Sequence, residues 1–68
     1  MIIGTIIKLG NGFGTVVYEK DGTQHEAFFH ASALKKISFS SLKIGDKVQI
    51  TLRNNDEAFV DTLTIIDL

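Results

Sequence analysis

The sequence predicts a small all-β domain, a five-stranded antiparallel barrel, on three observations. β-branched residues dominate the apolar runs, and in residues 47–53 apolar and polar side chains alternate with a period of two. Glycine, asparagine and aspartate separate these runs. The chain has 68 residues, none of them proline, and 44% are hydrophobic. A chain of this length forms one domain around one compact core.

The apolar runs define the strands and their connections. Strands are expected at residues 2–9, 13–18, 25–30, 47–53 and 58–66. Gly10-Asn11-Gly12 and Asp21-Gly22 supply residues that tolerate a positive φ, as tight hairpin turns require. The second connection is expected to span residues 19–24, residues 31–34 to form a short helical turn, and residues 38–42 an irregular loop.

The last strand has a mixed pattern. Phe59, Leu63 and Ile65 share one phase, and Asp61 interrupts it, which favours a β-bulge. Five strands in so short a chain leave exposed edges unless the sheet closes into a barrel. The pattern alone fits both an SH3-like barrel and an oligonucleotide- or oligosaccharide-binding (OB) barrel.

Charge and composition narrow the function classes. Seven Lys and Arg against eight Asp and Glu give a net charge of −1, with no global attraction to phosphate. Without cysteine there are no disulfides or thiolate metal ligands, which fits a reducing compartment. The first residues resemble neither a signal peptide nor a membrane helix. We therefore expect a soluble cytoplasmic protein with no membrane partner and no cofactor.

Two aromatic segments, residues 12–16 and 27–34, carry the functional information. Phe28 and His30 share one face of their strand, and Phe29 lies on the opposite face. A barrel wall is one layer thick, so one face lines the core and the other meets water or a ligand. We expect Phe29 to point inward.

With Phe29 and Val16 inward, Phe13, Phe28 and His30 share the outer surface. Exposed aromatic rings are suited to stacking on unpaired bases, at about 1–3 kcal/mol per base. Lys8 shares the outward phase if Ile7 is buried, and it is then placed to meet a phosphate.

In order along the chain come Gly-Thr-Ile-Ile-Lys (4–8), Gly-Phe-Gly (12–14), Phe-Phe-His-Ala-Ser-Ala-Leu (28–34), Leu42 and Gly45. This order resembles a bacterial cold-shock domain over nearly the whole chain. The resemblance implies a five-stranded OB barrel that binds single-stranded RNA or DNA through surface aromatics and has no catalytic activity. It also implies base-stacking roles for Phe13, Phe28 and His30, and it matches Phe39 to an aromatic in the loop before the fourth strand.

The chain departs from that family at several aromatic positions. Leu9 and Gly10 stand where the family has Trp and Phe, and Thr15 and Ala31 each replace a Phe. Asn11 stands where the family has a basic residue, because the first hairpin is shorter. With about half of the aromatic platform missing, we expect weaker binding and a shorter footprint than in a typical member.

The remaining candidates each have an ordinary alternative. Lys35 and Lys36 either contact phosphate or form a solvated loop, and Phe39 either contacts a base, which we favour, or ties its loop to the core. His25 and His30 have no companions at metal-ligand spacing. The serines at 38, 40 and 41 have no neighbouring base, so no enzyme is expected.

The sequence thus predicts a domain that binds single-stranded RNA or DNA and acts as an RNA chaperone. The rival hypothesis is a protein-interaction barrel or a strand-exchanged homodimer, because Leu9, Thr15 and Ala31 make the same face more aliphatic. A monomer is expected, with a homodimer left open.

Overall fold

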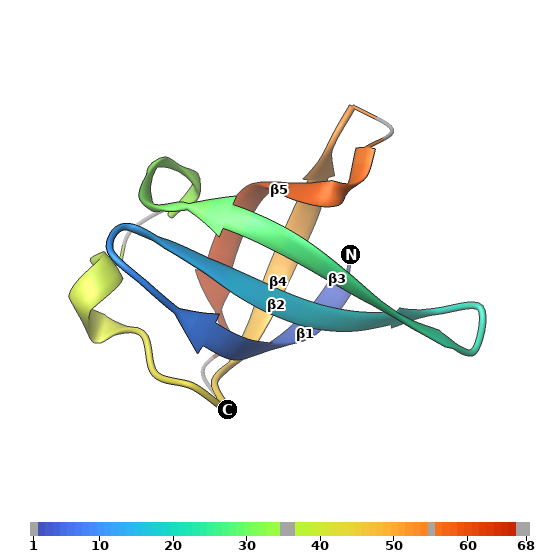
Figure 1. The fold of residues 1–68 in the computed structure, drawn as a ribbon, viewed down its shortest axis with the longest axis horizontal. Helices are drawn as coiled ribbons and strands as arrows, with labels where there is room; N and C mark the ends of the chain where they lie inside the picture. The colour runs from blue at the N-terminus through green and yellow to red at the C-terminus, as the bar shows by residue number, and fades with distance from the viewer. Residues whose placement is uncertain (1, 35–36, 55, 67–68) are drawn as a thin grey trace.

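The computed structural model describes residues 2–34, 37–54 and 56–66. Five strands close into a barrel (Figure 1). The strands are β1 (Ile2–Leu9), β2 (Phe13–Lys20), β3 (Thr23–His30), β4 (Lys47–Arg53) and β5 (Asp56–Ile65). Two short 3-10 helices, η1 (Ala31–Ala33) and η2 (Phe39–Ser41), lie between β3 and β4. Neither of these helices, in the part of the chain described, has the length and apolarity needed to cross a membrane.

The strand order around the barrel is β1-β2-β3-β5-β4, and β4 pairs back with β1. The first three strands form a meander, and every pairing is antiparallel except that of β3 with β5. This is the arrangement of an OB barrel, so the predicted fold class is confirmed.

The hairpin between β2 and β3 is tighter than the sequence suggested. Lys20 pairs with Thr23, and the two residues between them have positive φ, 55° at Asp21 and 78° at Gly22. Two such residues fit the right-handed twist of the flanking strands and let pairing continue to the turn. Both strands therefore extend into the region expected to be a loop.

The core fills the interior of the barrel, and every strand contributes to it. Tyr18 is the largest of its fully buried side chains, and the η1 and η2 region contributes Ala33 and Leu42. The buried apolar residues are Ile6, Val16, Tyr18, Ala27, Phe29, Ala33, Leu42, Val48, Ile50, Val60 and Leu63.

A bulge in β1 changes which of its side chains face outward. Ile6 pairs with Val16 and Lys8 pairs with Thr15, so Ile7 is left without a partner in the ladder. The condition on which Lys8 was placed outward, burial of Ile7, is not met, because this side chain is 43% exposed. Lys8 faces outward all the same, because the bulge lets two consecutive residues point away from the core.

A second bulge lies in β5, at the predicted position. Thr51 pairs with Thr62 and Leu52 with Val60, so the ladder passes over Asp61. The bulge reverses the phase of the strand.

Leu63, beyond the bulge, and Val60, before it, both point into the core. Phe59 is therefore out of phase with Leu63 and faces outward, although these two residues share one phase in the sequence pattern.

Candidate functional site

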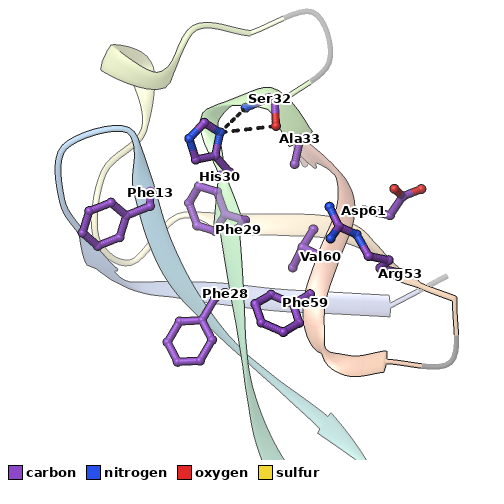
Figure 2. Close-up of a pocket in the computed structure, with 10 residues that line it drawn as sticks. All are labelled: Phe13, Phe28, Phe29, His30, Ser32, Ala33, Arg53, Phe59, Val60 and Asp61. Carbon is purple, nitrogen blue, oxygen red and sulfur yellow. Dashed lines mark hydrogen bonds between the residues drawn. The ribbon is translucent and has the colours of Figure 1, made fainter.

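Three phenylalanine rings stand on the outer wall of the barrel, one each from β2, β3 and β5. Phe13 is 55% exposed, Phe28 49% and Phe59 45%. His30, also exposed, lies on the same wall because it is the ladder partner of Phe13. We call these four residues the aromatic face (Figure 2).

The β2–β3 ladder fixes the orientation of most of this face. Phe13 pairs with His30 and Thr15 with Phe28, and cross-strand partners point to the same side of a sheet. Phe29, between Phe28 and His30, is only 2% exposed and lies in the core. The predicted orientation of Phe28 outward and Phe29 inward is therefore confirmed.

Gly14 makes the inward position of Phe29 possible. A Cβ added to Gly14 would lie 2.6 Å from the Phe29 ring and 2.8 Å from the carbonyl oxygen of Lys8. No side chain fits there. The Gly-Phe-Gly segment therefore contributes to both the core and the outer surface of the barrel. Gly14 leaves room for a core ring while Phe13 stands outside.

Phe59 extends the face across the join between β3 and β5. It pairs with Phe28 in the parallel register, and the two ring centroids are 6.3 Å apart with planes tilted by 49°. Figure 2 shows these rings side by side, with Phe13 on one side of them and Arg53 on the other. Phe59 was not predicted as a site residue. The sequence signal for it is the bulge at Asp61, which turns the residues before Asp61 to the opposite faces and so brings Phe59 to the outside.

His30 is held in a fixed orientation by the turn that follows it. Its Nδ1 accepts a hydrogen bond from the Ser32 backbone N–H at 3.2 Å and lies 3.3 Å from the Ser32 hydroxyl. This contact caps η1. With Nδ1 as the acceptor, a neutral imidazole carries its proton on Nε2.

Two hollows flank Phe28. The first lies toward β5 and the β4–β5 turn, and its lining includes Phe59, His30 and Arg53. The second lies toward the β1–β2 hairpin, between Phe13 and Phe28, and we call it the Thr15 slot. Its lining is Lys8, Leu9, Gly10, Phe13, Gly14, Thr15 and Phe28.

The lining of the first hollow includes one cation, Arg53, together with the Asp61 carboxylate, and the lining of the second includes Lys8. Sequence analysis singled out Lys8 but not Arg53, because only the folded β4–β5 hairpin brings Arg53 to the aromatic face. The predicted Lys35 and Lys36 lie outside the described residues.

Phe39 is placed apart from the aromatic face. It is half-buried, its ring packs against that of Phe29 at a centroid distance of 6.2 Å, and it lines neither hollow. This position corresponds to the alternative in which Phe39 ties its loop to the core. A base contact from Phe39 stays a prediction.

The other polar candidates have local structural partners. His25 stacks on Tyr18 with centroids 5.5 Å apart, and the Ser38 hydroxyl lies within 3.2 Å of the hydroxyls of Ser40 and Ser41. The described residues contain no group of three or more His, Cys, Asp or Glu arranged to hold a metal ion.

No protein-family model, curated protein or solved structure matches this chain. The aromatic face and its two hollows are therefore the features that indicate what this protein can bind.

Proposed function

We propose that this protein binds single-stranded RNA or DNA by stacking unpaired bases on the aromatic face. The observation that carries the proposal is the exposure, by about half, of Phe13, Phe28 and Phe59 on one wall of an OB barrel. Clustered apolar side chains on a surface mark a binding site. OB barrels bind oligonucleotides on the face of strands 2 and 3 and at the loops joining strands 1–2 and 4–5.

The two hollows lie along this same route, from the β1–β2 hairpin across the face of β2 and β3 to the β4–β5 hairpin. The Thr15 slot reaches the β1–β2 hairpin at Gly10, and the other hollow reaches the end of β4 at Arg53. A strand laid along this path meets Phe13, then Phe28, then Phe59, with a cation near each end. Aromatic stacking accepts any base, because every base has a π-face.

Only unpaired bases offer their faces to such a surface, because bases within a duplex are already stacked. Binding would therefore shift nucleic-acid hairpins toward the open state by mass action. This supports a role as an RNA chaperone in the cytoplasm, in keeping with the resemblance of the chain to cold-shock domains.

The face sets an upper limit on affinity. Three ring stacks at about 1–3 kcal/mol each give roughly 3–9 kcal/mol before the entropic cost of ordering a flexible strand. The upper end of that range corresponds to a dissociation constant of about 0.3 μM, and the ordering cost weakens it further. Phe59 partly compensates for the absence of rings at Thr15 and Ala31.

The proposal is tested by titrating the protein with a short pyrimidine oligonucleotide while following backbone amide shifts. We expect saturable shifts centred on Phe13, Phe28, His30 and Phe59. The absence of shifts at millimolar oligonucleotide would overturn the proposal. Sedimentation analysis would then test the alternative of a homodimer or a protein-interaction barrel.

A pair of variants separates the aromatic face from general surface stickiness. Phe28→Ala should weaken binding about 5- to 150-fold, the loss of one base stack. Ile44→Ala removes another apolar side chain, 67% exposed and outside both hollows, and should leave binding unchanged. Equal effects of the two substitutions would contradict a specific aromatic site.

A further inference from the structure

The floor of the Thr15 slot is unusual for an outward-facing position. Thr15 is the ladder partner of Phe28, and it shares the outer side of the sheet with Phe13 and Phe28. Both of those rings are about half exposed, whereas Thr15 is only 5% exposed. Its side chain therefore lies at the bottom of a recess whose walls include two aromatic rings.

The hydroxyl of Thr15 has no partner within the described part of the chain. It makes no side-chain hydrogen bond there, and no unpartnered side-chain oxygen or nitrogen among the described residues is sealed from solvent. The Thr15 oxygen consequently opens into the slot. A hydroxyl can donate one hydrogen bond and accept others, so the floor offers both to a ligand.

Gly10 positions one wall of the slot. A Cβ added to Gly10 would lie 2.8 to 3.2 Å from three atoms of the Phe13 ring, so this ring rests against the Gly10 backbone. Glycine at this position lets the Phe13 ring lie over the hairpin.

We propose that the Thr15 slot receives the edge of one unpaired nucleobase, inserted between Phe13 and Phe28, with a polar group of the base bonded to the Thr15 hydroxyl. This inference rests on the proposed function and adds a mode of contact, insertion in place of flat stacking on the surface. Lys8, an exposed residue in the lining of the slot, is placed to meet the phosphate of the inserted nucleotide.

The chemistry of the slot favours a base over an apolar protein side chain. The ring walls suit any flat apolar group, but an aliphatic side chain would cover the Thr15 hydroxyl without giving it a hydrogen bond, at a cost in free energy. A nucleobase offers aromatic faces to the walls and donors and acceptors along its edge. The nearby Lys8 adds complementarity to a phosphate.

The substitution Thr15→Phe separates insertion from flat stacking, because the two modes predict opposite results. A ring at position 15 fills the slot and blocks insertion, so affinity for an oligothymidylate of about six nucleotides, within the usual footprint of an OB barrel, should fall at least about 5-fold. Under flat stacking alone the added ring is one more platform, and affinity should rise by a similar factor.

Two further measurements keep the test decisive if Thr15→Phe disturbs the fold, which circular dichroism would reveal. Thr15→Val keeps the shape and removes the hydroxyl, and binding should weaken about 2- to 10-fold. In the wild-type complex, the Thr15 methyl group should show nuclear Overhauser contacts to base protons.

The outcomes for the two proposals are distinguishable. If the wild-type protein does not bind the oligothymidylate, the proposed function itself fails. If the wild type binds but Thr15→Phe binds equally or more tightly, or if Thr15→Val is neutral and the methyl contacts are absent, insertion fails and surface stacking stands.

Discussion

The β2–β3 and β4–β5 hairpins build the same aromatic face by different means. The β2–β3 ladder runs from Phe13↔His30 to Lys20↔Thr23 without a shift in register. The β4–β5 ladder shifts twice between Thr51 and Arg53. The uninterrupted ladder sets several side chains outward by simple alternation, whereas the interrupted one brings out a single ring, Phe59, at a bulge.

This difference shows that the bulge at Asp61 determines the composition of the aromatic face. Because of it, β5 buries both Val60 and Leu63, which an unbroken strand would place on opposite faces. The same change of phase puts Phe59 beside Phe28. A local irregularity thus gives the face its third ring while the core stays filled.

The largest expected effect comes from comparing the stability losses caused by substitutions on the inner and outer faces of the regular β2–β3 ladder. Phe29→Ala removes a ring that is 2% exposed and should destabilise the domain by about 3–5 kcal/mol, which is comparable with the total stability of a small domain. Phe28→Ala, at the neighbouring outward position, should cost less than about 1 kcal/mol. Urea unfolding monitored by circular dichroism measures both. Equal losses would show that the faces are not distinct.

Deleting Asp61 tests the irregular ladder. The deletion removes the extra residue, so Val60 follows Thr62 in regular alternation, with Val60 still inward and Phe59 still outward. The core and the aromatic face keep their residues, so the unfolding free energy should change by less than about 1 kcal/mol, and oligonucleotide binding should be kept.

The matched control, Asp61→Ala, keeps the residue count and should change the unfolding free energy by less than about 0.5 kcal/mol. A deletion variant that loses several kcal/mol of stability together with oligonucleotide binding would contradict the assignment of Asp61 as the extra residue of the bulge.

Phe59→Ala asks whether the ring supplied by the bulge takes part in binding. Affinity for a short pyrimidine oligonucleotide should fall about 5- to 150-fold, with little change in melting temperature because the ring is exposed. Ile3→Ala, at a position 52% exposed on β1, is the control and should bind as the wild type does. If Phe59→Ala also binds normally, the contact surface ends at Phe28.

The smallest effect concerns the two cations, one beside each hairpin. With about two phosphates neutralised, the logarithm of the binding constant should fall against the logarithm of salt concentration with a slope of about −1.4. Lys8→Gln and Arg53→Gln should each make the slope shallower by about 0.7. A much steeper slope for the wild type would indicate that charge outweighs stacking.

Much of the regular part of the molecule was predictable from the sequence. Period-two alternation and turn residues located all five strands, with the observed bounds for β1 and β4, and they gave the orientations of Phe28 and Phe29. These features depend on short-range pattern and on the pleat of a strand, which the sequence expresses directly.

The features that were missed depend on contacts distant in sequence. The bulge at Ile7 is visible only once β1 is paired with β2, and Phe59 reaches the site only through its parallel pairing with Phe28. Arg53 joins the aromatic face for the same reason. The burial of the Thr15 side chain also depends on residues that are its neighbours only in the folded structure. Alternation predicts which face of the sheet Thr15 lies on, but not how far the neighbouring rings cover it.

The parallel pair Phe28↔Phe59 joins β3 to β5, and Leu34, which follows η1, forms an isolated parallel bridge to Leu63. A ligand that contacts both Phe28 and Phe59 spans this join. Binding therefore stabilises the pairing of β3 with β5, which closes the barrel. Amide hydrogen exchange along β5 should then slow when oligonucleotide is bound, and loosening of the join should release the ligand.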